Sequence, residues 1–397
     1  MFKTPIPKQE LDDRLTKFYS LMNEVYPDWD TAVILSKVNQ YYFTGTMQDG
    51  MLLVTKERKA FYFVRRSFER AKAESLFSDI YPMESYRDAV AVTGGDCGNT
   101  FVETEVVTWG IMDRLQKYFK MGTISSLDRV ILAVRSVKSP LELEKLEHAG
   151  KQHDDLLQHI VPALLREGMN EAEFVAEILV KMVELGHQGI CRFSMFQTEM
   201  VVGQIGFGES SIYPTSFDGP GGAYGLCPAV PLGGSRERKL RKGDLIFVDI
   251  GFGYDGYHTD KTQIYLFGGK PTDEMIKLQR ACIEVQARLA LLLKPGAVPS
   301  EIYQTVTNEL SDDFKQNFMG FGQRQVKFLG HGVGLHVDEF PVIANGFKDP
   351  LAENMVIALE PKKGLADLGM VGVEDTYIVT PQGGRCITGG GKDIIVI

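Results

Sequence analysis

Residues 243–262 read Gly-Asp-Leu-Ile-Phe-Val-Asp-Ile-Gly-Phe-Gly-Tyr-Asp-Gly-Tyr-His-Thr-Asp-Lys-Thr, and the rest of the second half is organised around them. Leu245–Gly251 is rich in Ile, Val and Phe, which is typical of a buried strand. Asp255-Gly256 is the strongest short-range signal for a two-residue hairpin turn. His258–Phe267 is therefore predicted to return as the second strand of a hairpin.

The turn determines which residues face each other across this hairpin. With Asp255-Gly256 as the loop, the predicted cross-strand pairs are Tyr254 with Tyr257, Asp249 with Thr262, and Gly251 with Asp260. Side chains alternate between the two faces of a strand, so Asp249 and Asp260 share one face. As diagonal neighbours they would lie roughly 7–8 Å apart between Cα atoms.

Two acids on one face of an apolar hairpin need an explanation. One interpretation pairs an acid with Lys261 or uses it to cap a turn, although strand alternation places Lys261 on the opposite face. Burying an unpaired carboxylate costs several kcal/mol, against a total stability of about 5–15 kcal/mol. A bound cation would remove that cost, and the hairpin alone leaves an ion pair and a metal site both open.

The length of 397 residues predicts two domains. We expect them at 1–135 and 136–397, with the boundary just before the helix that opens at Ser139. The first is expected to be a mixed α/β domain without catalytic motifs. Its predicted strands are Thr31–Lys37, Met51–Lys56, Ala60–Val64 and Phe101–Thr108, and its predicted helices are Arg66–Phe77 and Ile111–Tyr118.

The second domain is predicted to open on a long helix. Ser139-Pro140-Leu141-Glu142 is a capping box with proline at the first helical position, and the helix should run to about Arg166. The glycine- and proline-rich residues 203–243 lead into the hairpin and are expected to line a site. Further helices are expected from Asn170 to about Gly186, over Thr272–Lys294 and over Ser300–Phe318.

The charge and the cysteines limit the class of protein. A formal net charge of −9 argues against nucleic acid or an anionic membrane surface as the main partner. No apolar run reaches transmembrane length, and Met1–Lys8 shows no apolar leader segment. The five cysteines are scattered and form no Cys-x-x-Cys pair, so they indicate reduced thiols and a cytoplasmic location.

Three further segments, like the hairpin, place an acid or a histidine within or beside apolar or glycine-rich sequence. His331 stands between glycines in Gly330–Gly334, Glu360 ends the apolar strand predicted over Met355–Leu359, and Glu374 interrupts the strand predicted over Val371–Val379. For each acid singly, a salt bridge is the simpler explanation. Together, two Asp, two Glu and one His on β structure indicate a metal site.

Four carboxylates and one imidazole would balance two divalent cations. Oxygen ligands suit Mn²⁺, and imidazole admits Zn²⁺, Fe²⁺ or Co²⁺. Two such ions about 3.5–4 Å apart can share a water, deprotonate it and polarise a carbonyl. The sequence therefore favours hydrolysis of an amide over a thiol or Ser-His-Asp mechanism.

At this point the chain resembles the pita-bread-fold metallopeptidases, in the branch of Xaa-Pro aminopeptidase, prolidase and creatinase. The order and spacing of the matching segments fit that family, with eleven residues from Asp249 to Asp260. These segments are Gly243–Gly251, Gly256–Thr262, Gly330–Leu335, Met355–Pro361 and Val373–Thr376, together with Ile131–Ala149 and Tyr42–Gly45.

The resemblance implies an α+β protein. A C-terminal pita-bread (creatinase/aminopeptidase) fold would follow a smaller α/β creatinase-like N-terminal domain. It also implies that two divalent metal ions, Mn, Co, Zn or Fe, are held by Asp249, Asp260, His331, Glu360 and Glu374. Asp260 and Glu374 would bridge both ions, Glu360 would double as the proton shuttle, and the chain would form a homodimer.

The sequence departs from the family pattern at three places. The family's peptidases carry a histidine near the position of Leu232 and another at the position of Asp338, and they carry an arginine at the position of Gly372. The two histidines ordinarily hold the substrate. One hypothesis is that His336 or His258 takes over as a catalytic residue; the other is that His258 points past the metals into a hydrogen bond.

Three functions are weighed. The first is cleavage of the bond before proline by a metal-bridging hydroxide, as in an Xaa-Pro aminopeptidase or prolidase, with a peptide or small amide as substrate. The second is a non-peptidase relative acting on another amide or C–N small molecule with the same metal site, which the missing histidines favour. The third, a non-catalytic binding protein, is disfavoured because all five ligands are present.

Overall fold

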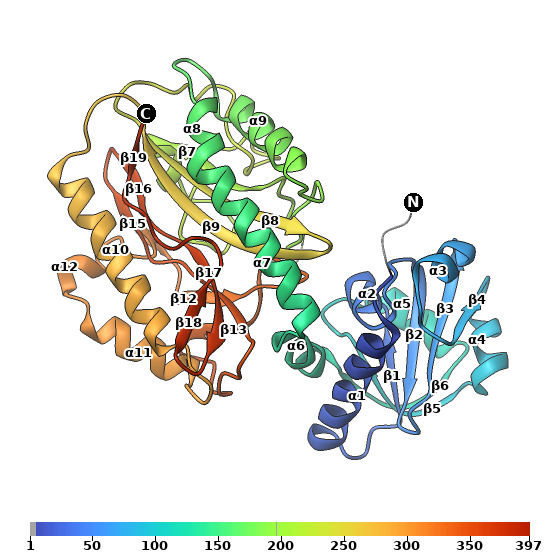
Figure 1. Cartoon of the computed structure of the whole chain (residues 1–397). Helices are drawn as coiled ribbons and strands as arrows, with labels where there is room; N and C mark the ends of the chain where they lie inside the picture. Colours follow the sequence, from blue (N-terminus) through green and yellow to red (C-terminus); the bar gives the residue numbers. More distant parts are fainter. Residues whose placement is uncertain (1–4, 196) are drawn as a thin grey trace. The chain divides into compact units, whose positions relative to one another are not determined.

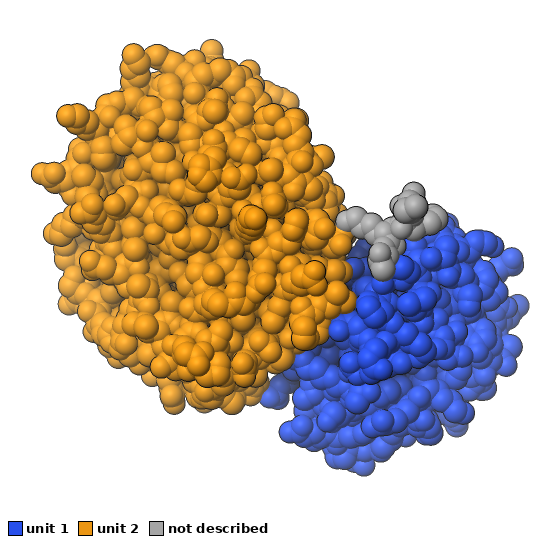
Figure 2. All heavy atoms as spheres, viewed as in Figure 1, with its two compact units in different colours: residues 1–135 blue, residues 136–397 orange. Residues whose placement is uncertain are grey.

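The computed structural model describes residues 5–195 and 197–397. The chain forms two compact units, Met1–Arg135 and Ser136–Ile397, coloured separately in Figure 2. The sequence prediction about a leader segment concerns Met1–Lys8, of which residues 1–4 lie outside the described part. No described helix is both long and apolar enough to cross a membrane.

The first unit is built on a mixed six-stranded sheet in the order β4-β3-β2-β1-β5-β6 (Figure 1). The strands are β1 (Thr31–Ile34), β2 (Asp49–Thr55), β3 (Ala60–Arg66), β4 (Ile80–Pro82), β5 (Asp96–Val102) and β6 (Lys120–Ser126). The helices are α1 (Lys8–Val25), α2 (Lys37–Thr44), α3 (Phe68–Glu74), α4 (Tyr86–Thr93), α5 (Trp109–Gln116) and α6 (Asp128–Ser136). The predicted α/β class of this unit is confirmed.

Several predicted boundaries in this unit are wrong. The strand expected to reach Thr108 ends at Val102. The next residue, Glu103, is buried and accepts hydrogen bonds from the amides of Leu35 and Ser36, at 2.6 and 2.7 Å. Those bonds also mark the end of β1, so a buried carboxylate terminates both strands where apolar content alone predicted continuation.

In the second unit, the predicted hairpin and its register are confirmed. β8 (Leu245–Tyr254) pairs with β9 (Tyr257–Leu266). The observed pairs include Tyr254 with Tyr257, Asp249 with Thr262, and Gly251 with Asp260. Asp255 and Gly256 have φ angles of 49° and 95°, the left-handed conformation that a type I′ turn requires.

The hairpin belongs to a four-stranded sheet in the order β19-β9-β8-β7, with β7 (Gly203–Phe207) and β19 (Ile395–Val396) at its edges. A five-stranded sheet has the order β13-β12-β14-β17-β18. Its strands are β12 (Phe328–Gly332), β13 (Glu339–Ala344), β14 (Val356–Leu359), β17 (Asp375–Thr380) and β18 (Gly383–Cys386). Two short ribbons pair β10 (Gly320–Phe321) with β11 (Arg324–Gln325) and β15 (Lys362–Leu365) with β16 (Gly369–Gly372).

The predicted capping box at Ser139 is present, and a second capping box opens the helix expected from Asn170. The long helix is α7 (Pro140–Asp155), a π-helical turn at Leu156–Ile160 and α8 (Val161–Leu164). The other helices are α9 (Glu171–Glu184), α10 (Asp273–Leu292), α11 (Pro299–Glu309) and α12 (Asp312–Lys315), with a 3₁₀ turn at Gly208–Ile212. Figure 1 shows the strands of this unit between α7 and α10.

The helix expected over Ser300–Phe318 is wrong in its second half. α11 ends at Glu309, and Leu310 is extended, with ψ at 138°. Ser311 then caps a new helix, because its hydroxyl accepts a hydrogen bond from the amide of Phe314 at 3.2 Å. A serine followed by two aspartates is a helix start, and here it overrides the apolar periodicity.

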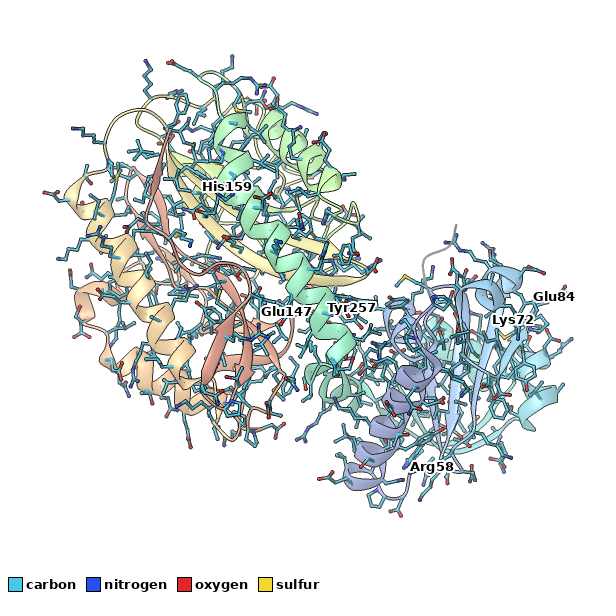
Figure 3. All side chains as sticks on the ribbon, viewed as in Figure 1. Arg58, Lys72, Glu84, Glu147, His159 and Tyr257 are labelled. Carbon is cyan, nitrogen blue, oxygen red and sulfur yellow. The ribbon has the colours of Figure 1, made fainter. Side chains whose placement is uncertain are left out.

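Side chains of β9 fix the hairpin to the elements packed against it. On one face, the Lys261 ammonium lies 2.6 Å from Asp375 of β17, and neither side chain is exposed. This confirms that Lys261 points away from the two acids. At the turn, the Tyr257 hydroxyl donates to Glu142 of α7 at 2.9 Å, and Figure 3 labels Tyr257 beside that helix.

Candidate active site

The five side chains that the sequence singled out come together in one pocket. Asp249 comes from β8, Asp260 from β9 and His331 from β12, while Glu360 follows β14 and Glu374 precedes β17. All five line the pocket, with Phe193, Phe217, Asp218, Gly219, Val337 and Asp338. The expectation that residues 203–243 line the site is met by Phe217–Gly219.

The junction of the two sheets positions these acids. The amide of Thr262 donates to the carbonyl of Glu374 at 3.1 Å, which links β9 to the segment before β17. The amide of Asp260 donates to the hydroxyl of Thr376 at 2.9 Å. Glu374 is thereby held beside the acidic face of the hairpin, although more than a hundred residues separate them.

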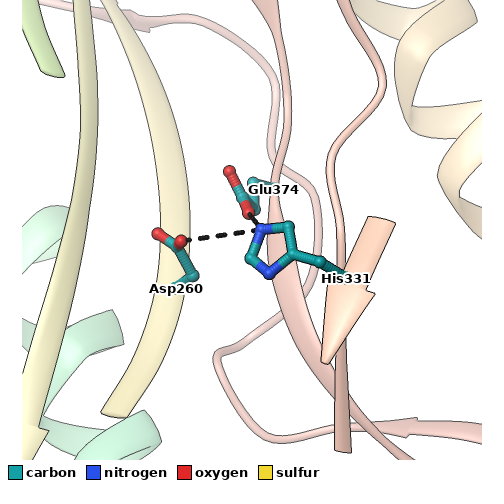
Figure 4. A group of neighbouring side chains, drawn as sticks. All are labelled: Asp260, His331 and Glu374. Carbon is teal, nitrogen blue, oxygen red and sulfur yellow. Dashed lines mark ion pairs between the residues drawn. The ribbon is translucent and has the colours of Figure 1, made fainter. Parts of the chain in front are cut away.

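His331 lies at the centre of one half of the pocket. Its Nε2 lies 3.4 Å from Glu360 Oε1, 3.5 Å from Glu374 Oε1 and 4.0 Å from Asp260 Oδ2. Figure 4 shows His331 together with Asp260 and Glu374. Its Nδ1 lies 3.2 Å from the carbonyl of Gly332. A bond from Nδ1–H to that carbonyl leaves the Nε2 lone pair directed at the carboxylates, as metal-binding imidazoles require.

This half of the pocket fits a divalent cation. Ligand atoms of Asp260, His331 and Glu374 all lie within 4.8 Å of one another. Glu374 Oε1 is buried and has no hydrogen-bond partner among the described residues, which is costly unless an ion completes the site. Carboxylate oxygens with one imidazole suit Mn²⁺, Zn²⁺, Fe²⁺ or Co²⁺.

The carboxylates repel one another in this buried setting. Burial raises the pKa of Asp249 to about 7 and that of Glu360 to about 8, and the neighbouring Glu374 contributes to both shifts. Burial opposes a charge on His331, but Asp338, Glu374 and Glu360 outweigh it and raise the pKa of its imidazole. The cluster therefore favours bound positive charge.

The sequence prediction missed one member of the cluster, Lys362 of β15. Its side chain is unexposed, and its Nζ lies 2.8 Å from Asp249 Oδ2, 3.0 Å from Glu360 Oε2 and 2.5 Å from Glu374 Oε2. The ring of Phe247 lies 5.7 Å from the same ammonium. Lys362 stands two residues after Glu360 in an extended segment, and that spacing places both on one face.

The carboxylate oxygens thus form two sets. Glu360 and Glu374 each direct one oxygen toward His331 and the other toward Lys362. Asp260 faces His331, whereas Asp249 faces Lys362 and accepts its second hydrogen bond from the Thr262 hydroxyl at 2.8 Å. The set around His331 matches one metal ion, and an ammonium already occupies the other set.

The two histidines considered as catalytic residues lie elsewhere. His258 is fully buried, with Nδ1 3.2 Å from the carbonyl of Gly334 and Nε2 2.8 Å from the Gln188 amide nitrogen. His336 has Nδ1 3.8 Å from Glu339. Neither is among the residues that line the pocket in the described chain. The geometry of His258 agrees with the hydrogen-bonding alternative.

Of the three departures from the family pattern, Asp338 lies at the pocket itself. Its carboxylate is 3.8 Å from His331 Nδ1. Leu232 is buried, with 6% exposure. Gly372 has a φ of 134°, and a Cβ there would lie 2.5 Å from the carbonyl of Pro361. An arginine at that position does not fit this backbone.

The pocket is narrow. It encloses about 20 Å³, close to the room needed for a single water. The rings of Phe193 and Phe217 meet edge to face at its rim, with centroids 5.5 Å apart. A larger cavity of about 610 Å³ between Tyr213, Tyr224 and Phe321 contains none of the five side chains, so size alone does not mark the site.

Comparison with known proteins agrees with this architecture. Metallopeptidase family M24 matches residues 144–381, and the creatinase/prolidase N-terminal domain matches residues 14–137. The Xaa-Pro dipeptidase of Pyrococcus furiosus is 25% identical over 97% of this chain and 100% of its own length. The Xaa-Pro dipeptidase of Pyrococcus horikoshii is 25% identical over 92% of this chain and 94% of its own.

The crystal structure of the prolidase from Pyrococcus horikoshii OT3 superposes with a TM-score of 0.78, covering 96% of this chain and all of that one at 23% identity. This likeness shows a shared fold. The predicted α+β architecture, a pita-bread domain after a creatinase-like N-terminal domain, is confirmed. The family match covers more than half of the chain, and we conclude that the chain is an enzyme that belongs to metallopeptidase family M24.

Proposed function

We propose that the enzyme is a divalent-metal-dependent hydrolase that cleaves the peptide bond before proline. The observation that carries this proposal is the convergence of Asp260, His331 and Glu374, whose ligand atoms lie within 4.8 Å of one another. The relatives from Pyrococcus with matching length are named Xaa-Pro dipeptidases, which supports short Xaa-Pro peptides as the first substrates to test.

In this proposal Asp260, His331, Glu374 and Glu360 hold the metal ion. A bound divalent ion supplies Lewis-acid polarisation of the carbonyl and lowers the pKa of a coordinated water. Glu360 lines the pocket with one oxygen toward His331. From that position its carboxylate accepts the proton of the attacking water and returns it to the leaving nitrogen.

The walls of the pocket suit a small peptide with a free amino end. Phe193, Phe217 and Val337 give an apolar wall for a proline ring, and Asp218 and Asp338 give negative charge for an ammonium. A substrate larger than a water requires the aromatic rim to move, because the enclosed space is about 20 Å³. Residues at the rim therefore exclude water until a substrate enters.

A second candidate function is hydrolysis of a different amide or C–N bond in a small molecule. Asp338 favours this alternative, because it stands where the family resemblance implies a substrate-holding histidine in the peptidases of this branch. An ionised carboxylate at that position only accepts hydrogen bonds, so it cannot donate one to the carbonyl oxygen of a peptide as that histidine would. The metal ligands serve either reaction.

A substrate panel separates the two functions. The purified protein is assayed with Mn²⁺, Co²⁺ and Zn²⁺ against Xaa-Pro dipeptides, Xaa-Pro-containing longer peptides, matched Xaa-Ala dipeptides and small amides. We expect the wild-type protein to release proline from the dipeptides only when metal is present. The Asp260→Asn variant should release none. Metal binding without cleavage of any Xaa-Pro bond would reject the peptidase and favour the second function.

We also propose a homodimer in the cytoplasm. All five cysteines, within the described residues, are free thiols, which supports a reducing compartment. The dimer rests on the family resemblance. Light scattering on the purified protein measures the mass directly, and a monomeric mass near 44.3 kDa would reject the dimer.

A further inference from the structure

We infer that the ammonium of Lys362 takes the place of one of two cations, so that the site binds a single divalent ion per chain. The inference rests on the proposed function only for the presence of that ion. The four carboxylates and one imidazole predict two ions, but Lys362 already supplies one positive charge to three of those carboxylates.

The contacts of Lys362 are those of a fully engaged cation. An ammonium has three N–H donors, and three different carboxylates accept them: Asp249 at 2.8 Å, Glu360 at 3.0 Å and Glu374 at 2.5 Å. The side chain has no solvent exposure. Three carboxylates therefore compensate the cost of burying this ammonium.

The backbone holds this lysine in place. Lys362 pairs with Gly372 in the ribbon of β15 and β16, and its carbonyl accepts a hydrogen bond from Met319 at 2.8 Å. Gly372 matters here because a Cβ on it would lie 2.6 Å from the Cα of Lys362. The glycine at that departure from the family pattern thus permits the close approach of the strand that carries Lys362.

A metal ion and this ammonium compete for the same oxygens. A divalent ion binds carboxylate oxygen at about 2.0–2.2 Å. To reach the three oxygens that accept from Lys362, such an ion would have to lie where the Nζ atom lies now. Two cations in that space would repel each other without an intervening ligand. The second ion therefore does not fit while Lys362 keeps its hydrogen bonds.

The other set of ligands remains intact. Nε2 of His331 and one oxygen each from Asp260, Glu360 and Glu374 face one another on the side away from Lys362. Glu374 Oε1 has no hydrogen-bond partner among the residues described. One ion held by His331, Asp260, Glu360 and Glu374 would satisfy it, while the other oxygens of Glu360 and Glu374 keep their hydrogen bonds to Lys362.

The chain supplies a matched control, Lys363. It is the next residue of the same strand, and its ammonium donates to the backbone carbonyls of Phe314 and Gln316 instead of to the acidic cluster. Replacing Lys363 removes an equal charge and an equal side chain from β15. It leaves the carboxylates of the site as they are.

The test counts bound ions. Wild-type protein, Lys362→Ala and Lys363→Ala are stripped with chelator, loaded with Mn²⁺ and freed of excess ion by gel filtration. Manganese is then measured per chain by elemental analysis, and electron paramagnetic resonance distinguishes an isolated Mn²⁺ from a spin-coupled pair. We expect one isolated Mn²⁺ in wild type and in Lys363→Ala, and a coupled pair in Lys362→Ala.

Each result decides the inference. A coupled pair of Mn²⁺ in wild-type protein overturns it, and so does the absence of bound Mn²⁺. A folded Lys362→Ala that still binds one ion overturns the exchange of ammonium for metal. If Lys362→Ala does not fold, the count and spectrum of wild type decide alone.

The same samples, assayed on Xaa-Pro dipeptides, separate this inference from the proposed function. One Mn²⁺ without hydrolysis rejects the function and keeps the role of Lys362. Two Mn²⁺ with hydrolysis keep the function and reject the role of Lys362.

Discussion

Lys362 Nζ and Glu374 Oε2 lie 2.5 Å apart, and both side chains are buried. The other oxygen of the Glu374 carboxylate faces His331. Lys362→Met removes the charge and keeps the volume. Breaking a buried ion pair by removing one partner costs about 3–5 kcal/mol, and added Mn²⁺ should recover part of it by binding the freed carboxylates. Urea unfolding with chelator and with Mn²⁺ measures both effects.

Lys363→Met is the control for that experiment, since its ammonium contacts backbone carbonyls outside the cluster. It should be destabilised without a large response to Mn²⁺. Equal free energies of unfolding in urea for Lys362→Met and wild type, both in chelator, would contradict the buried ion pair.

Removing a metal ligand should abolish tight binding of the ion. His331→Ala deletes the imidazole nitrogen that faces Asp260, Glu360 and Glu374. We expect its affinity for Mn²⁺ to fall by more than the roughly 10–100-fold that loss of a supporting group costs. Calorimetric titration measures the affinity, and an unchanged value would place the ion elsewhere.

His258→Ala should affect stability more than turnover. The imidazole is buried against the carbonyl of Gly334 and the side chain of Gln188, and leaving those groups without it costs about 1–3 kcal/mol. His336→Ala should leave stability nearly unchanged. Turnover is measured for both variants under conditions where they are folded, and a loss above about tenfold in either would give that histidine a catalytic role.

His187 should make the protein acid-sensitive. Burial lowers its pKa from 6.5 to about 4, and its Nδ1 accepts a hydrogen bond from the amide of Gly253 at 2.8 Å. Above pH 6.5 the ring is neutral in both states and its contribution to stability is complete. As the pH falls from 6.5 toward 4, the unfolded chain binds a proton that the folded chain does not, and stability is lost.

That loss amounts to about 2 kcal/mol at about pH 5. His187→Phe keeps a ring against Phe252, which lies 5.2 Å away, and cannot titrate. The free energy of unfolding, measured in urea at about pH 7 and about pH 5, should therefore change less in the variant by roughly that amount. The same pH dependence in both proteins would assign the acid sensitivity to other groups.

Local rules were sufficient for the hairpin. Asp255-Gly256 fixed the loop, the loop fixed the register, and strand alternation placed Asp249 and Asp260 on one face with Lys261 on the other, all as observed. Turn type and strand alternation could not predict that the hairpin acids lie beside His331, Glu360 and Glu374. The contacts between Thr262 and Glu374 that bring the sheets together leave no periodic trace in the sequence.

Lys362 was missed although the signal was present. Alternation from Glu360 along Pro361 and Lys362 would have placed the lysine on the face of the glutamate. Apolar periodicity also failed at Glu103 and Ser311, where one polar side chain ends a strand or starts a helix. Such positions depend on where a hydrogen-bonding partner lies in three dimensions.

β9 carries opposite charges on successive residues: Asp260 faces the pocket, and Lys261 lies on the reverse side against Asp375. Inserting or deleting one residue before this pair would exchange their faces. The ammonium would then enter the pocket, and the carboxylate would meet Asp375. Homologous chains that share this chemistry should therefore keep the number of residues between the turn and Asp260 unchanged.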